Sequence, residues 1–208
     1  MVRAFGRWLL WLVLAGLALQ LYFLAGIALM AVLDPHSTAF QRSEAWRVAT
    51  ASARGETPWR WRQRWVDGEQ ISPNLWRAVV ASEDAGFFDH GGVDWTAIEK
   101  AWQKNERRQE QAERRAAHSP NRPVREAKVV GGSTITQQLA KNLLLSGERK
   151  LLRKGQELVL SLMLELVLDK RRILEIYLNS VEWGEGVFGA EAAAQRYFNK
   201  PAARLSAY

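Results

Sequence analysis

One long apolar segment precedes a series of shorter segments in which apolar residues recur with a helical period. Residues 8–33 are almost entirely apolar, with Gln20 as the one amide, and Asp34 and Pro35 follow. As a helix this segment would be about 39 Å long, enough to cross a hydrocarbon core of roughly 30 Å with some tilt. It also exceeds the apolar region of a cleavable signal peptide. The pattern therefore predicts a retained membrane helix over residues 8–33, with a buried core helix as the alternative.

Helical periodicity and capping residues predict a mainly α-helical domain downstream. Ser72 and Pro73 suit the start of a helix that runs to Glu83. Ser133 or Thr134 can cap the helix that follows two glycines. Further helices are expected over residues 94–102, 149–169, 170–179 and 190–198.

The segment 149–169 is the most apolar of these predicted helices. Beyond residue 157 it is apolar nearly all round, which predicts burial. Its polar residues form one stripe, made of Lys154, Glu157, Ser161 and Glu165. Because unpaired buried charge is costly, we expect this stripe to face partners or a wet cleft. The charges argue against a second membrane span.

Aromatic and basic residues alternate over residues 59–65. Such alternation fits an edge strand with one aromatic face. It also fits a segment at the membrane surface, with tryptophans at headgroup depth and arginines on lipid phosphates, or a contact with single-stranded nucleic acid. The nearby membrane segment favours the headgroup interpretation over nucleic acid, and the edge strand remains open beside it.

The amino-acid composition limits the kinds of functional site and partner that this chain can have. The 208 residues suit one domain with an appendage, and the formal charge of +7 favours an anionic partner. The chain has no cysteine, which excludes disulfides, thiolate nucleophiles and cysteine-ligated zinc. The histidines, His36, His90 and His118, have no metal-ligand spacing. A nucleotide P-loop is not supported, because no Gly-Lys-Ser/Thr triplet is present.

Candidate chemistry is densest over residues 81–95. Glu83 and Asp84 are adjacent, and Phe87 and His90 follow closely. Carboxylates beside aromatic side chains lose water and become suited to proton transfer. Glu83 is therefore a candidate base, with a helix-end acid beside a structural histidine as the alternative.

Cationic residues farther along the chain would complete such a site. Lys141 follows the second glycine pair, and Arg153 and Lys154 precede Glu157. Basic side chains can neutralise a diphosphate leaving group. A carboxylate base with a cationic clamp on a membrane-anchored domain thus suits transfer from a lipid-linked, phosphate-bearing donor.

Five motifs resemble, in order, those of the family 51 peptidoglycan glycosyltransferases. They are Glu83-Asp84-x-x-Phe87-x-x-His90-x-Gly92, Gly131-Gly132-Ser133-Thr134-x-Thr136-Gln137-Gln138-x-x-Lys141-Asn142, Arg153-Lys154-x-x-Glu157, Arg172-Ile173-Leu174-Glu175-x-Tyr177-Leu178-Asn179 and Gly184-x-Gly186-x-x-Gly189. One such motif would be weak, but five in order are specific. The short chain resembles the monofunctional biosynthetic branch of the family.

The resemblance implies a mainly α-helical, lysozyme-like glycosyltransferase domain preceded by one N-terminal transmembrane helix. The expected parts are a cytoplasmic tail (1–7), the transmembrane helix (8–33), a juxtamembrane connector (34–70) and the catalytic domain (71–208), truncated at its C-terminal end. The implied location is the bacterial inner membrane, with a cytoplasmic N-terminus and a periplasmic catalytic domain. Residues 105–128 are longer and more charged than the mobile loop expected there.

The implied reaction polymerises lipid II into β-1,4-linked glycan strands, with inversion and release of undecaprenyl diphosphate. Glu83 would be the general base, and Glu157 would assist at the diphosphate, either through a divalent cation (Mg²⁺ or Mn²⁺) or by orienting basic groups. No organic cofactor is implied. The implied substrate-binding set, in which the first three residues position Glu83 and close the cleft, is Asp84, Phe87, His90, Ser133, Thr134, Gln138, Lys141, Asn142, Arg153 and Lys154.

The implied partners are lipid II, the growing glycan strand and the bacterial membrane, with cell-wall synthesis and division proteins as further candidates and no nucleic acid. A lytic murein hydrolase of lysozyme-like fold is one alternative, although it would need no diphosphate clamp. An inactive membrane-anchored scaffold is another. We expect Glu83 to be the one carboxylate without a basic partner, and Glu157 to lie among Lys141, Arg153 or Lys154.

Overall fold

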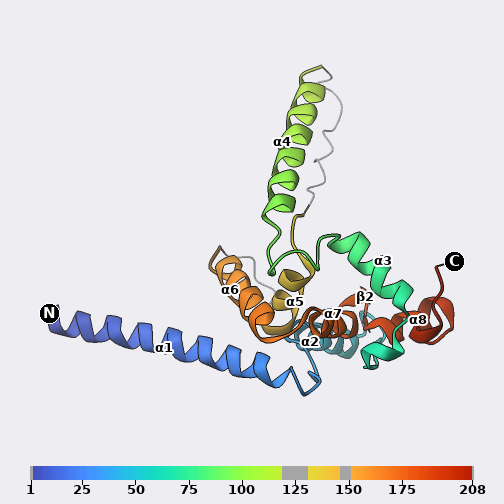
Figure 1. The fold of residues 1–208 in the computed structure, drawn as a ribbon, viewed down its shortest axis with the longest axis horizontal. Helices are drawn as coiled ribbons and strands as arrows, with labels where there is room; N and C mark the ends of the chain where they lie inside the picture. The colour runs from blue at the N-terminus through green and yellow to red at the C-terminus, as the bar shows by residue number, and fades with distance from the viewer. Residues whose placement is uncertain (1, 119–130, 146–150, 208) are drawn as a thin grey trace.

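The computed structural model describes residues 2–118, 131–145 and 151–207, most of which are helical (Figure 1). The α-helices are α1 (Val2–Leu29), α2 (Ala39–Ala53), α3 (Pro73–Glu83), α4 (Trp95–His118), α5 (Ile135–Leu144), α6 (Leu151–Val167), α7 (Lys170–Ser180) and α8 (Ala190–Phe198). The remaining elements are the 3-10 turns η1 (Gly68–Gln70) and η2 (Ala202–Arg204) and the strands β1 (Arg62–Gln63), β2 (Glu182–Gly184) and β3 (Val187–Phe188). The predicted mainly α-helical fold is confirmed.

Helix α1 projects from the body of the molecule, toward the left in Figure 1. Its residues Arg3–Leu29 are long and apolar enough to cross a membrane, with a mean hydropathy of 2.2. Only 6% of the most apolar stretch of this helix is buried against the rest of the protein, so the alternative of a buried core helix is wrong. The regular helix also begins and ends earlier than predicted, because residues 30–33 continue as turns.

Polar contacts hold α1 to the body at two points. The amides of Gln20 and Gln156 on α6 bond reciprocally, at 2.9 and 3.0 Å. Arg172 on α7 donates to the backbone carbonyls of Met30 at 2.8 Å and of Leu33 at 3.0 Å. Because the last carbonyls of a helix lack intrahelical partners, this arginine satisfies the end of the membrane segment.

Helix α5 lies at the centre of the core. Ile135, Leu139 and Leu143 are buried on it, and it packs against α6, α7 and α2. Helix α2 falls within the predicted connector, yet Gln41 on it is buried and donates to the carbonyl of Ser180 at 3.3 Å. The connector is therefore partly built into the domain.

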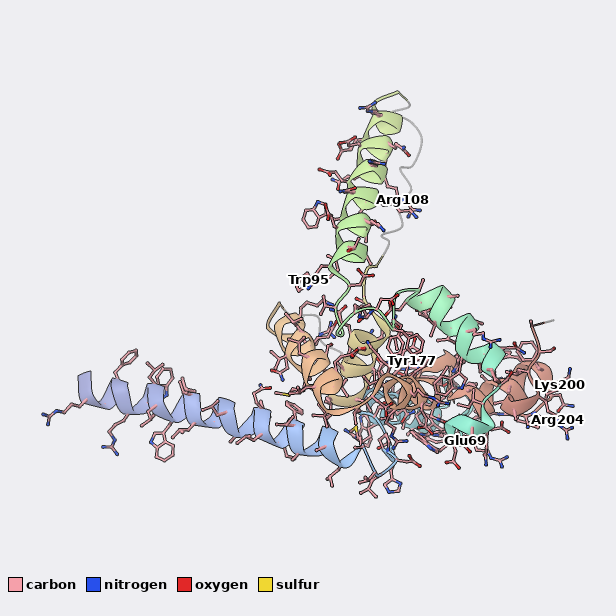
Figure 2. All side chains as sticks on the ribbon, viewed as in Figure 1. Glu69, Trp95, Arg108, Tyr177, Lys200 and Arg204 are labelled. Atoms are coloured by element: carbon pink, nitrogen blue, oxygen red, sulfur yellow. The ribbon has the colours of Figure 1, made fainter. Side chains whose placement is uncertain are left out.

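The polar segment after residue 102 was predicted to extend the preceding helix before it runs into a flexible loop. This extension is confirmed as far as His118, the end of α4, because residues 103–118 are rich in the good helix formers Gln, Glu, Arg and Ala. Helix α4 stands away from the body, and Trp95 at its base is exposed (Figure 2). The remainder of the predicted flexible loop, residues 119–130, lies outside the described residues.

Helix α6 is not buried all round as predicted. Val159, Leu162 and Leu166 are exposed on one face, because the packing against α5 covers a different side of the helix. The polar stripe does meet partners, as expected. Lys154 bonds to Glu157, and Glu165 accepts from Thr136 and Lys170.

A small sheet closes the end of the body near α8. Strand β1 lies at its edge and pairs in parallel with β3, which pairs antiparallel with β2. The edge-strand interpretation of the aromatic-basic segment is thus confirmed for Arg62–Gln63. Gly186 has a φ of +71°, and a Cβ there would lie 2.2 Å from the carbonyl oxygen of Arg60, so the turn requires glycine.

Candidate active site

The turn after α3 is built on the buried carboxylate of Asp84. Its exposed fraction is 8%, and it accepts from the backbone N–H of Ile135 at 3.0 Å. It also accepts from His90 Nε2 at 3.0 Å. Because His90 Nδ1 accepts from the N–H of Gly92 at 3.1 Å, the ring proton is on Nε2. Asp84 therefore ties the turn to the start of α5.

Further bonds lock this turn against three helices. Thr134, which caps α5, donates to the carbonyl of Gly92 at 2.6 Å. Lys170 on α7 donates to the carbonyl of His90 at 2.6 Å and to Glu165 on α6 at 2.8 Å. Gly92 has a φ of +88°, and a Cβ there would lie 2.9 Å from Glu165 Cγ, so a side chain would break the junction.

Phe87 lies beneath the turn and does not line its surface. None of its side chain is exposed, and Lys170 Nζ lies 4.5 Å from its ring centroid. Phe87 packs in the core beneath the turn, and Asp84 and His90 hold the turn by hydrogen bonds. These three residues therefore support the segment that follows Glu83. Their expected role of positioning Glu83 stays a prediction.

Glu83, the last residue of α3, is exposed and is held by a neutral amide. Its Oε2 accepts from Gln138 Nε2 at 3.1 Å, and Gln138 Oε1 accepts from the Tyr177 hydroxyl at 3.0 Å. Burial and the charge of Glu83 raise the pKa of Tyr177, so the phenol stays protonated as the donor. The relay from Tyr177 through Gln138 aims an N–H group at Glu83.

Two expectations about Glu83 need correction. Its carboxylate is not desolvated among aromatic side chains, because Phe87 turns into the core and Phe88 points into a different cavity. Glu83 has no ion pair within the described residues, as expected. It is not alone in this, since Asp94 accepts from the N–H of Ala97 and has no ion pair in the same part of the chain.

Glu83 lies on the wall of a cavity of about 320 Å³ between α3, α4 and the start of α5. The first turns of α4 contribute Lys100 and Lys104, and the segment before α5 contributes Ser133 and Thr134. The sequence analysis missed the two lysines because nothing in their spacing linked α4 to the motifs. Together these residues give a cavity with a free carboxylate on one side and ammonium groups on another.

The cationic residues of α5 and α6 form a separate part of the site. Glu157 is 3% exposed and accepts from Lys154, as expected. Arg153 has a buried Nε without a partner within the described residues. Lys141 is exposed at the C-terminal end of α5, one residue before Asn142. In the described part of the chain, no hydrogen bond or ion pair joins Glu157, Lys154, Arg153 or Lys141 to Glu83.

The donor set around Glu157 does not fit a divalent cation. Within the described residues, no three side chains of the metal-ligating types gather. Glu157 supplies one carboxylate, and the ammonium of Lys154 already occupies it. A divalent cation prefers several oxygen ligands and is repelled by a lysine.

Comparison with known proteins identifies the family of the chain. A family model described as Transglycosylase matches residues 51–208. The chain is 51% identical over 210 residues to a Burkholderia thailandensis protein named "Biosynthetic peptidoglycan transglycosylase", covering 99% of this chain and 74% of that protein. A protein of the same name from Ralstonia nicotianae is 56% identical over 189 residues, covering 91% of this chain and 72% of the relative. The family match begins inside the predicted connector.

Proposed function

The chain belongs to the transglycosylase family, and from this premise we propose that it polymerises lipid II into β-1,4-linked glycan strands. It is a peptidoglycan glycosyltransferase with a lysozyme-like domain. The observation that carries the finer proposal is Glu83, an exposed carboxylate that a neutral amide holds on the wall of a cavity.

Glu83 acts as the general base. It takes the proton of the acceptor 4-hydroxyl while that oxygen attacks the anomeric carbon of the donor. The bond from this carbon to the diphosphate oxygen breaks, its electron pair leaves with undecaprenyl diphosphate, and the configuration inverts. Within the described residues the Glu83 carboxylate accepts from Gln138 alone, so it keeps lone pairs for this proton, and the link to Tyr177 limits its orientations.

Cationic side chains stabilise the departing diphosphate. Lys141, Arg153 and Lys154 bind it, and Glu157 keeps Lys154 in place. The buried Nε of Arg153 has no partner in the described part of the chain, which suits a donor waiting for an anion. Ser133, Thr134, Gln138 and Asn142 line the donor side. Because the donor set around Glu157 does not fit a divalent cation, no step here depends on one.

The membrane provides the substrate and the setting. Helix α1 anchors the chain in the bacterial inner membrane with its N-terminus in the cytoplasm, and the catalytic domain works in the periplasm. The exposed apolar face of α6, formed by Val159, Leu162 and Leu166, lies beside α1 and rests in lipid. Cell-wall synthesis and division proteins are further proposed partners.

The test is polymerisation of purified lipid II by the detergent-solubilised chain. We expect polymer from the parent protein, and Glu83→Gln should lower the rate about 1,000-fold, since a positioned base contributes roughly 10²–10⁴. Glu106→Gln, an exposed glutamate on α4, is the matched control and should leave the rate unchanged. A parallel reaction with a chelator tests whether polymerisation requires a divalent cation.

Each alternative predicts a different outcome. Release of muropeptides from sacculi without polymer from lipid II would identify a murein hydrolase and overturn the proposal. Polymerisation that survives Glu83→Gln would contradict the assignment of the base. Absence of both activities in folded protein would support the inactive scaffold.

A further inference from the structure

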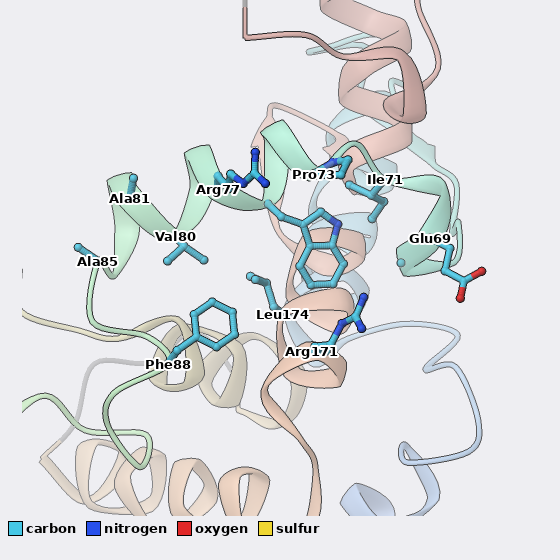
Figure 3. A pocket seen from close by; sticks show the side chains of 12 residues that line it. Glu69, Ile71, Pro73, Arg77, Val80, Ala81, Ala85, Phe88, Arg171 and Leu174 are labelled. Carbon is cyan, nitrogen blue, oxygen red and sulfur yellow. The ribbon is translucent and has the colours of Figure 1, made fainter.

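The aromatic and basic segment at residues 59–65 takes no part in the proposed reaction, yet it lines a cavity of its own. This cavity has a volume of about 480 Å³, and its lining residues are 59–62, 185–187, 196 and 197. It shares no lining residue with the cavity that holds Glu83. The cavity of about 530 Å³ in Figure 3, in contrast, shares Ala85 with the Glu83 cavity and belongs to the same region. The segment 59–65 therefore contributes to a separate site.

Arginines give this separate cavity a positive charge. Arg60 and Arg62 come from the segment of β1 and Arg196 comes from α8, and their side chains are exposed. None of the three side chains has a hydrogen bond or an ion pair within the described residues. The carboxylate that lines the cavity, that of Glu185, pairs at 3.6 Å with Arg47 on α2, outside the cavity. The guanidinium groups therefore have donors available for an anionic ligand, and their planar shape suits carboxylates.

Exposed aromatic rings line the same cavity. Trp59 is 53% exposed and Tyr197 is 54% exposed. The ring of Trp59 stacks on that of Trp61 with centroids 6.4 Å apart, and Trp61 packs on the buried Phe188 with centroids 4.6 Å apart. Tryptophan, tyrosine and arginine are enriched in protein interfaces and carry much of their binding free energy. The residue types of this cavity therefore match those of a protein-binding site.

The backbone around the cavity is held in place without a ligand. The N–H of Arg62 donates to the carbonyl of Gly186 at 2.8 Å, where β1 pairs with β3. The Tyr197 hydroxyl donates to the carbonyl of Trp183 at 3.1 Å. A Cβ at Gly184 would lie 2.1 Å from that hydroxyl oxygen, so this close approach requires glycine. A preformed site loses less conformational freedom when a ligand binds, which favours affinity.

The cavity lies on the side of the body away from the membrane segment. In Figure 1, α1 projects to the left of the body, whereas α8, which carries Arg196 and Tyr197, lies at the right. The headgroups of a membrane that α1 crosses lie where α1 leaves the body, on the opposite side from α8. We therefore favour a ligand from the aqueous side over the headgroup interpretation of residues 59–65.

We propose that this cavity is a docking site for an acidic peptide segment of a partner protein. Carboxylates of the segment bond to Arg60, Arg62 and Arg196, and its apolar side chains pack on Trp59 and Tyr197. The formal charge of +7 on the chain attracts an acidic segment over distance, and the arginines fix its position. Because the two cavities share no residue, the partner binds while the Glu83 cavity stays open.

The test begins with selection of random dodecapeptides, displayed on phage, on the full chain in detergent. We expect the selected sequences to be rich in Asp and Glu and to include apolar residues. Fluorescence anisotropy then measures the affinity of a selected peptide. Arg60→Gln and Arg196→Gln should each weaken binding about fivefold, the loss of one exposed charge-assisted contact, and Trp59→Ala should weaken it about tenfold. Added salt should weaken binding to the parent protein, because it screens exposed charges.

Matched controls separate the cavity from the rest of the surface. Arg204 on η2 and Trp46 on α2 are exposed and do not line the cavity. Arg204→Gln and Trp46→Ala should leave the affinity for the peptide unchanged. The melting temperature should change little in the arginine variants, because their side chains are exposed.

Selected peptides without acidic residues, or peptides whose binding survives substitution of all three arginines, would overturn the inference. So would displacement of the peptide by dihexanoylphosphatidylglycerol or by soluble muropeptides as effectively as by unlabelled peptide, because the cavity would then bind a lipid headgroup or a glycan. The rate of lipid II polymerisation should be unchanged in Arg60→Gln and Arg196→Gln. A fall in that rate would assign the cavity to the substrate and contradict the docking site.

Discussion

The turn after α3 and the first half of α6 both hold charged residues of the site, but they are built in opposite ways. In the turn, Asp84 is buried between two donors, and His90 bonds through both ring nitrogens. On α6, Arg153 keeps a buried Nε without a partner in the described part of the chain. The polar groups of the turn are hydrogen-bonded without a ligand, whereas α6 retains an N–H donor that a ligand can use.

This difference matches the two tasks of the proposed reaction. A general base must be held in one place before the substrate arrives, so its support is fixed by buried bonds. A clamp for a diphosphate must keep donors available, because the ligand supplies the acceptors. Substitutions should therefore affect folding stability in the turn and activity on the cationic side.

The largest effect should follow Asp84→Ala. The substitution leaves the N–H of Ile135 and the ring of His90 without an acceptor, which should lower the free energy of unfolding by about 3 kcal/mol. Thermal and chemical unfolding in detergent measure this change in the free energy of unfolding. Asp89→Ala, at an exposed position of the same turn, should change little. Equal effects of the two substitutions would contradict the view that the turn depends on Asp84.

Next in size is the effect of Lys141→Met on activity. Loss of one group that stabilises charge in the transition state should lower kcat about 100-fold. Lys141 is exposed, so the melting temperature should stay unchanged. Lys200→Met, an exposed lysine after α8, is the control. A loss of stability in place of activity would remove the contrast between the two regions.

Tyr177→Phe should have a smaller effect, since it acts on Glu83 through Gln138. We expect kcat to fall about tenfold, or about 1.4 kcal/mol, at unchanged KM. Gln138→Leu should show a similar loss, and the double variant should lose little more, because both substitutions break one relay. Additive losses would contradict the relay.

The same phenol predicts a dependence of stability on pH. Burial and the charge of Glu83 raise the pKa of Tyr177 in the folded state, so the folded chain holds this proton more tightly than the unfolded chain. As the pH rises above the ordinary phenol value of about 10, the parent protein should lose stability relative to Tyr177→Phe. Unfolding at pH 8 and pH 11 in detergent measures the difference.

The smallest effect concerns the contact between α1 and α6. Gln20→Leu removes one partner of the amide pair and should cost about 0.6 kcal/mol, the average for such bonds in membranes. Gln20→Leu combined with Gln156→Leu should recover part of this loss, because no unpaired amide remains. The measurement is thermal unfolding in lipid nanodiscs, and a double variant less stable than both single ones would contradict the pairing.

Much of the fold follows from short-range patterns. Ser72 caps α3 as expected, and Thr134 is the one of the two candidates, Ser133 and Thr134, that caps α5. The stripe on α6 was predicted to meet partners, and Lys154 and Glu165 confirm it. These predictions hold because capping and helical faces depend on residues within one or two turns.

Features that depend on distant neighbours were not predicted. Tyr177 contributes to the site from α7, although it was quoted only as part of a motif, and Lys100 and Lys104 enter the cavity because α4 starts beside the second glycine pair. The exposed face of α6 depends on which of its sides pack against α5 and α1. None of these placements has a signature within a single helix.

The sequence by itself determined the long apolar helix at the N-terminus, the helical class and the residue types at the site, because hydrophobic length, helical period and motif spacing are local properties. The sequence already named Glu83 as the candidate base, and only the tertiary structure shows how it differs from Asp84, which is adjacent and chemically alike. The end of α3 turns Asp84 toward the N–H of Ile135 and His90 and leaves Glu83 outside with one amide. Burial between donors makes one carboxylate a structural link, and exposure keeps the other available for a proton.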